Sequence, residues 1–172
     1  MFRYVKTLRL SLFYLVVALW PMLQTTSGMI GRGWLLLIGV ALLGAGIFIT
    51  NPITDATPRI ANTLHTICGA LVILTFPIVA TLVAGSLARN QAWASGQPRL
   101  VWETFLVWFG MGAFFGSIII SRAINPAAGR VGPQVYLGWP NRFMVVTYQI
   151  WLIRAALLTV LLPKSKVTHL RA

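Results

Sequence analysis

Long apolar runs alternate along the chain with short polar connectors. Five such runs, each of roughly the 17–25 residues that a membrane-spanning helix needs, cover residues 8–24, 33–50, 64–88, 100–120 and 143–162. Backbone groups in lipid must hydrogen-bond within their own segment, so each run is predicted to be a helix. The apolar–polar alternation of a transmembrane β-barrel is absent from the sequence. The pattern therefore predicts an all-α, polytopic transmembrane helical bundle of about five spans.

The connectors are rich in Pro, Gly, Asn and Asp, which favour turns. The longest, residues 121–142, exceeds the length of most structureless loops and is expected to fold back as a cap or interfacial segment. Arg3, Lys6 and Arg9 precede the first run as in a signal peptide, but no small-residue cleavage site follows, so a retained helix is expected. Residues 1–172 are thus predicted to form a single integral membrane domain.

The composition supports lipid as the main solvent of the chain. Of its residues, 58% are hydrophobic and 9% charged, whereas soluble domains carry about 25% charged residues. The single cysteine excludes an intrachain disulfide, and two histidines with one cysteine are too few for an ordinary structural zinc site. No metal and no cofactor are therefore expected.

The net charge of +12 points to a lipid partner. The 14 basic residues are scattered between the apolar runs and form no basic stripe, which disfavours nucleic acid as a partner. Lys and Arg at span ends are expected to face anionic lipid headgroups. They divide almost evenly between the two predicted faces, so the positive-inside rule does not decide the orientation.

Ionisable residues of types that are rare in this chain lie in and next to the connector between the second and third runs. Asp55 is one of only two acidic residues in the chain, and His65 is one of only two histidines. With Arg59 and Cys68 they form a candidate polar pocket at the membrane surface, in which Asp55 and His65 would bind a headgroup or exchange a proton. The alternative, which we prefer, is a polar helix start with an interfacial histidine and a local contact between Asp55 and Arg59.

Two charged residues fall inside predicted spans. Each such charge costs about 2.5–3.5 kcal/mol on insertion scales, so a partner is expected. Glu103 lies about 5 Å and Arg154 about 12 Å from the same membrane face, given 1.5 Å per helical residue. An ion pair that locks two helices is the preferred interpretation, and a proton or transport route is the alternative. Tyr148 and Gln149 would extend this polar stripe or make ordinary interhelical hydrogen bonds.

Small and aromatic residues suggest how the spans pack. Gly112 and Gly116 form a G-x-x-x-G pattern, and further glycines line the second run. Such residues let helices approach closely, so packing within the chain is expected, with homodimerisation as the alternative. Five tryptophans near predicted span ends are interpreted as interfacial anchors: Trp20, Trp34, Trp102, Trp139 and Trp151.

Two stretches resemble the bacterial membrane proteins of the domain of unknown function 998 family. In "GVALLGAGIFITNPITDATPRIANTLHTICGALVILTFPIVA", a Gly-rich helix is followed by a polar elbow and then by a Thr and a His. The elbow positions that carry the likeness are Phe48, Asn51, Pro52, Asp55, Thr63 and His65. "GWPNRFMVVTYQIW" is similar to the family's Arg-led last helix, with Arg142 in the Arg position. The resemblance implies about six spans, hence a further N-terminal helix, and it implies no established activity.

Three functions are compatible with these features. The first is a non-enzymatic membrane protein or accessory of a complex in the bacterial cytoplasmic membrane, with a membrane-protein partner or a second copy of itself. The second is a small transporter or lipid-handling protein that uses the pocket at Asp55 and His65. The third is a membrane enzyme centred on the same two residues, although no catalytic motif is present. A cavity that reaches from His65 to the bilayer midplane would favour the second function.

Overall fold

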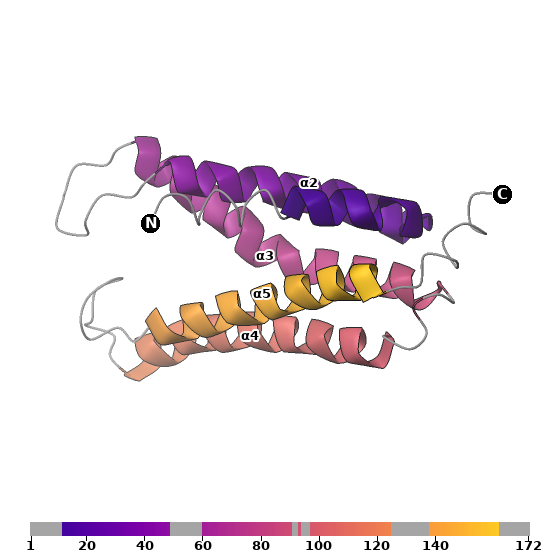
Figure 1. The fold of residues 1–172 in the computed structure, drawn as a ribbon. Coiled ribbons are helices and arrows are strands. Elements are labelled where there is room, and N and C mark those ends of the chain that lie inside the picture. The colour runs from indigo at the N-terminus through magenta and orange to yellow at the C-terminus, as the bar shows by residue number, and fades with distance from the viewer. Residues whose placement is uncertain (1–11, 49–59, 91–92, 94–96, 125–137, 162–172) are drawn as a thin grey trace.

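The computed structural model describes residues 12–48, 60–90, 93, 97–124 and 138–161. Apart from a few turn residues, these are helical, and none of them forms a strand. Helical residues Leu12–Met22 end in the 3-10 turn η1 (Trp20–Met22), and four long helices follow (Figure 1): α2 (Thr26–Ile47), α3 (Ile60–Ala88), α4 (Gln97–Ile124) and α5 (Gly138–Leu161). The all-α class predicted from the sequence is confirmed.

The helices α2 to α5 are each long and apolar enough to cross a membrane. Leu12–Met22 is a shorter apolar helix. Residues 8–11 of the first predicted span lie outside the described residues, so a fifth span stays a prediction. The chain is a membrane protein with four long candidate spans in its described part.

All four long helices begin earlier than the apolar runs predicted for them, α2 and α5 by the most. Helix α2 begins at Thr26 rather than Gly33, because Thr25 caps it: the Gly28 amide donates to Thr25 Oγ1 at 3.1 Å. Helix α5 begins at Gly138 rather than Phe143, with Pro140 in its first turn. The amides of that turn have no intrahelical acceptor, so a proline is tolerated there. Because both segments contain polar and turn-forming residues, the sequence predicted connectors there.

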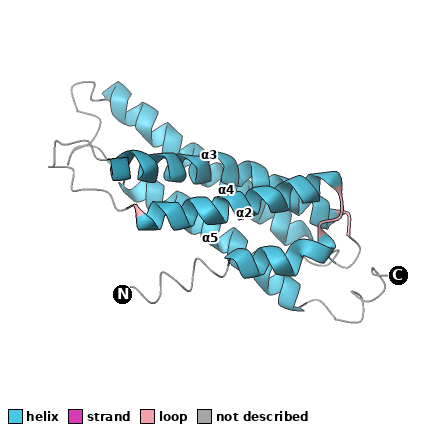
Figure 2. Cartoon of the chain, turned by 90° about the horizontal axis from the view of Figure 1, so that it is seen from above, coloured by secondary structure: helices cyan, strands magenta, loops and turns pink. Residues whose placement is uncertain are grey.

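The long helices form two hairpins. Helix α2 packs on α3, α4 packs on α5, and α3 also contacts α4. Helix α3 begins beside α2 and crosses toward the α4–α5 pair at its other end (Figure 1), and the helices overlap along one common long direction when viewed from above (Figure 2). The buried residues of α3 all lie from Phe76 onward. The first half of α3 is therefore less covered than the second.

An aromatic cluster fills the crossing of α3 and α5. The Phe76 ring stacks on Tyr148 with centroids 4.5 Å apart and meets Trp151 edge-on at 5.7 Å. All three side chains are buried. Aromatic pairs in these geometries contribute about 0.5–1.5 kcal/mol beyond their burial. The cluster fixes where the two hairpins meet.

A hydrogen bond next to Pro77 also links α3 to α5 at this crossing. A proline has no amide proton, so the Ile73 carbonyl, four residues earlier, has no intrahelical donor. The Tyr148 hydroxyl donates to this carbonyl at 2.9 Å. In lipid such a carbonyl must find a donor from a neighbouring helix, and α5 supplies it.

The predicted glycine contacts divide into two groups. A Cβ added at Gly39 would lie 3.1 Å from Phe13 Cζ, and one at Gly44 would lie 2.8 Å from Cys68 Sγ, so both glycines permit close packing. A Cβ added at Gly112 or Gly116 would meet nothing within 4 Å among the described residues. Among the described residues, the packing expected for this G-x-x-x-G pair is not found, because no described side chain lies within 4 Å of either Cβ position.

Candidate functional site

The polar pocket predicted at the elbow is described only in part. Asp55 and Arg59 lie outside the described residues, as do Asn51 and Pro52. His65 and Cys68 lie on α3, one turn apart. The predicted contacts of Asp55 with His65 and with Arg59 therefore stay predictions.

His65 joins the start of α3 to the end of α2. Its Nδ1 lies 2.8 Å from the Ala45 carbonyl oxygen and 2.8 Å from the Phe48 carbonyl oxygen. The last carbonyls of a helix lack intrahelical donors, so an imidazole N–H satisfies them. Because a nitrogen that faces two acceptors must carry the proton, Nδ1 is the donor and Nε2 is the acceptor nitrogen of the neutral ring. Two positions of the family resemblance, Phe48 and His65, thus meet in space.

Cys68 faces α2 and takes part in packing. The side chain is half-buried, with its sulfur against Gly44. A larger residue at either position would push the two helices apart. Among the described residues there is no group of three His, Cys, Asp or Glu side chains that could hold a metal ion.

A cavity of about 370 Å³ lies between α3 and α4, and we call it the α3–α4 groove. Its wall includes one imidazole and one hydroxyl and is otherwise apolar: His65, Thr66, Gly69, Ala70, Ile73, Leu74, Phe114 and Phe115. From His65 to Leu74 the wall follows α3 for about 14 Å, at 1.5 Å per residue. The groove residues of α3 belong to the first half of that helix. This half of α3 diverges from α4 and α5 (Figure 1).

The groove has a polar end and an apolar end. His65 and Thr66 mark the polar end, within two turns of the start of α3. Thr66 donates its hydroxyl proton to the Asn62 carbonyl at 2.8 Å, so its oxygen is left with acceptor capacity only. Leu74, at the other end, is 51% exposed and stands near the middle of α3. The apolar end therefore opens toward the surface of the bundle at mid-membrane depth.

Sequence reasoning found His65 but missed Phe114 and Phe115. Both are half-buried on α4 and form one wall of the groove. A phenylalanine in an apolar run has the same appearance whether it lines a groove or contacts lipid. The sequence holds no signal that would have separated these two from their neighbours.

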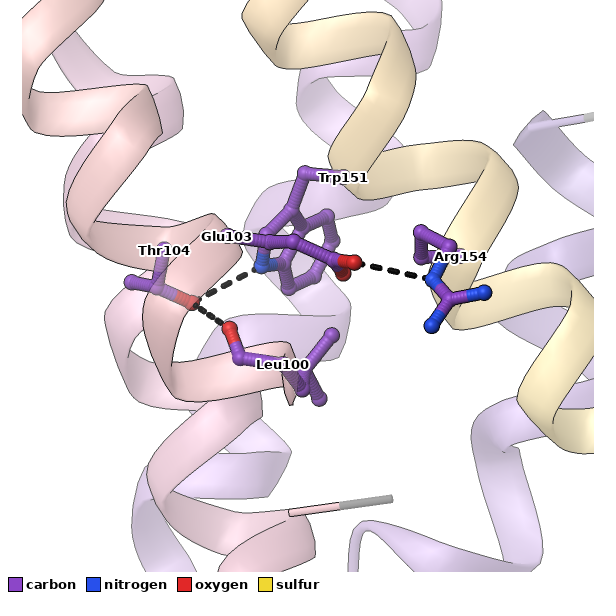
Figure 3. Close-up of polar contacts among 5 residues, drawn as sticks. All are labelled: Leu100, Glu103, Thr104, Trp151 and Arg154. Carbon is purple, nitrogen blue, oxygen red and sulfur yellow. Dashed lines mark hydrogen bonds and ion pairs between the residues drawn. The ribbon is translucent and has the colours of Figure 1, made fainter. Parts of the chain in front are cut away.

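The two membrane-embedded charges lie in contact near the opposite ends of α4 and α5 (Figure 3). Arg154 Nε donates to Glu103 Oε1 at 2.8 Å, with the side chains 32% and 12% exposed. The terminal nitrogens of Arg154 point away from Glu103 in Figure 3, so the pair is held by one nitrogen. Within the part of the chain that the structure describes, Glu103 Oε2 has no hydrogen-bond partner. The pair ties α4 to α5.

Neighbouring hydrogen bonds reinforce the α4–α5 contact. Trp151 Nε1 donates to Thr104 Oγ1 at 2.9 Å, and Thr104 Oγ1 donates to the Leu100 carbonyl at 2.8 Å (Figure 3). Trp151 is fully buried, so its interpretation as an interfacial anchor is wrong. The other four tryptophans of that group are exposed. Gln149 is exposed on α5 and takes no part in a polar stripe through the interior.

The last predicted family position, Arg142, lies near the start of α5. Its guanidinium carbon lies 5.4 Å from the centroid of the exposed Trp139 ring. A cation over an indole face at a helix end is typical of the membrane interface. This residue is far from the ion pair at the other end of the helix and shares no described contact with His65.

The comparisons with known proteins bear on the family alone. No curated protein and no solved structure matches the chain. The family described as "Protein of unknown function (DUF998)" matches residues 7–158, which include every described helix except the last residues of α5. The resemblance noted at the elbow and at the Arg-led helix is therefore confirmed, and the chain belongs to the DUF998 family.

Proposed function

We propose that this protein is a non-enzymatic, multi-pass protein of the bacterial cytoplasmic membrane that binds the chain of a lipid-like amphiphile in the α3–α4 groove. The observation that carries the proposal is the extent of the groove, from His65 near one end of α3 to Leu74 near its middle. Of the three functions considered, lipid handling is the one for which a cavity of this extent is needed.

The size and lining of the groove fit a hydrocarbon chain. Its volume of about 370 Å³ lies within the roughly 300–1,000 Å³ of small-molecule sites. The wall offers methyl, methylene and phenyl surfaces, with its two polar side chains at one end. A chain that enters beside the exposed Leu74 passes from the bilayer into the groove without crossing water. An amphiphile would therefore place its tail toward mid-membrane and its head near His65.

The other two functions have less support from the geometry. A protein that acts only as a packed accessory subunit has no need of an open groove between its hairpins. An enzyme centred on Asp55 and His65 requires both groups to face a substrate, and His65 Nδ1 is already engaged by two backbone carbonyls. The non-enzymatic interpretation is supported by the same engagement.

A blocking substitution tests the proposal. A Cβ added at Gly69 meets nothing within 4 Å, and Gly69 lines the groove, so Gly69→Leu fills the groove without disturbing helix packing. Gly85 is the matched control, because it is exposed on the same helix, outside the groove, with equally free space. The probe is a long-chain fatty alcohol with a diazirine near its chain end, added to the full-length protein in lipid nanodiscs.

Photolabelling should mark peptides that contain residues 65–74 and 114–115. Gly69→Leu should reduce this labelling at least about fivefold, which corresponds to about 1 kcal/mol, and Gly85→Leu should leave it unchanged. Labelling spread evenly over all lipid-facing helix surfaces, or equal labelling in the two variants, would contradict the proposal.

A further inference from the structure

We infer that the ligand of the α3–α4 groove carries an uncharged hydrogen-bond donor, a hydroxyl group, at its polar end. This inference rests on the proposed function and narrows it to alcohol-headed amphiphiles, such as long-chain alcohols and glycerides with a free hydroxyl. It follows from the hydrogen-bonding state of the two polar side chains in the groove wall.

The first of these side chains is His65. Its Nδ1 proton is committed to the Ala45 and Phe48 carbonyls, each at 2.8 Å. The neutral imidazole has one donor and one acceptor nitrogen, so Nε2 carries a lone pair. A ligand group that meets this nitrogen gains a hydrogen bond only if it brings a proton of its own.

The second side chain is Thr66. Its hydroxyl proton is given to the Asn62 carbonyl of the preceding turn at 2.8 Å. The remaining capacity of its oxygen is again that of an acceptor. His65 and Thr66 therefore present the same polarity to whatever occupies this end of the groove.

Charge separates a hydroxyl from other head groups. Among the described side chains that line the groove, none carries a fixed charge of either sign. The oxygens of a carboxylate or phosphate are hydrogen-bond acceptors, so they cannot bond to the two acceptors of the groove. The anion would also lose its hydration without meeting a counter-charge in the described wall. A protonated amine brings donors, but the described wall offers it no counter-charge, so its desolvation would be uncompensated. A hydroxyl donates its one proton to one of the two acceptors and carries no charge.

Three ligands with one chain length test the inference. A long-chain alcohol, its methyl ether and the corresponding fatty acid compete with the photoreactive probe for the full-length protein in nanodiscs at neutral pH. The ether has the same chain and oxygen but no proton to donate. The alcohol should bind roughly 3- to 10-fold more tightly than the ether, as expected for one net hydrogen bond, and more tightly than the carboxylate.

Two variants locate the preference. Thr66→Val removes one acceptor and keeps the shape, and the hydrogen bond described for Thr66 lies within its own helix, so the fold should be retained. His65→Phe removes the other acceptor together with the link to α2. The hydroxyl has one proton and donates it to one acceptor, so the preference for alcohol over ether should fall in at least one of the two variants.

The outcomes separate the two proposals. Loss of all competition in the unmodified protein would overturn the proposed function and, with it, the ligand class. Equal competition by alcohol and ether, or a preference for the carboxylate or for the corresponding primary amine, would overturn the ligand class and leave a lipid-binding groove. A preference unchanged in both variants would place the donor contact elsewhere and equally overturn the inference.

Discussion

Single residues in this membrane protein act mainly by satisfying backbone groups that a helix leaves unpaired. His65 does so at the end of α2, where it reaches the Ala45 and Phe48 carbonyls. Tyr148 does so in the middle of α3, where Pro77 removes a donor from the Ile73 carbonyl. In hydrocarbon no water is available for either purpose, so a side chain of a neighbouring helix takes its place.

This residue-scale account predicts the effect of Tyr148→Phe. The variant keeps the stacking ring and deletes the hydroxyl that serves Ile73, so it should lower the free energy of unfolding by about 0.6–1.7 kcal/mol, the range measured for interhelical hydrogen bonds. The measurement is reversible unfolding of the purified protein in mixed micelles. Tyr14→Phe is the control, because Tyr14 is 74% exposed, and it should be neutral.

Pro77 provides the second half of this test. Pro77→Ala returns an amide donor to the Ile73 carbonyl, so Tyr148→Phe should cost less in that background than in the parent protein. The difference is the coupling energy of a double-mutant cycle. Strict additivity of the two substitutions would mean that the Tyr148 hydroxyl does not compensate for the proline.

At the scale of helices, close approach of backbones holds each hairpin together. On α4, a Cβ at Gly110 would lie 3.2 Å from Met144 Cα and closer still to the Thr147 hydroxyl. Two residues further along, a Cβ at Gly112 would meet nothing within 4 Å among the described residues. The same residue type thus has opposite structural roles on two faces of one helix.

The contrast predicts how substitutions on α4 behave. Gly110→Leu should push α4 away from α5 and destabilise the protein by about 1–3 kcal/mol, as overpacking does. Gly112→Leu should change stability by no more than about 0.5 kcal/mol. Thermal unfolding in detergent, followed by tryptophan fluorescence, distinguishes the two. A strongly destabilising Gly112→Leu would indicate that this face of α4 is covered in the assembled protein.

At the scale of the whole molecule, the alternation of spans fixes which helix ends share a membrane face. Arg89 follows the end of α3, and Arg99 lies near the start of α4, on the same membrane face. Arg122 near the end of α4 and Arg142 near the start of α5 lie on the other face. His65 and Thr66, at the polar end of the groove, lie near the start of α3, which is on the second face. Its polar end is thus on the Arg122 side of the membrane.

Cysteine labelling checks this arrangement. In a Cys68→Ala background, which removes the native thiol, Arg89→Cys and Arg99→Cys should react with a membrane-impermeant maleimide from one side of the membrane. Arg122→Cys and Arg142→Cys should react from the other. Intact cells and inverted vesicles provide the two sides. Labelling of Arg89→Cys and Arg122→Cys from the same side would rule out α4 as a span.

Some features of the site could be anticipated from the sequence, and others could not. The depths of Glu103 and Arg154 in their runs suggested a contact, and the structure shows the two side chains 2.8 Å apart. His65 drew attention because histidine is scarce in the chain. The carbonyl groups that bind its imidazole could not be predicted, because every residue has a backbone carbonyl and the sequence does not show which one a side chain will reach. Phe114 and Phe115 were equally hidden among apolar neighbours.

The sequence by itself determined that this protein resides in a membrane, that it is helical, and where its long helices lie. The chain has too few charges to form a water-exposed surface, and its apolar runs have the length of a membrane span. In lipid, apolar runs of that length are stable as helices. The tertiary structure alone decided which apolar side chains face one another, that Trp151 is buried, and that α3 leaves α4 to open a groove. In a bilayer the surroundings are as apolar as the core, so an inward face and a lipid-facing one carry the same residues until the helices are packed.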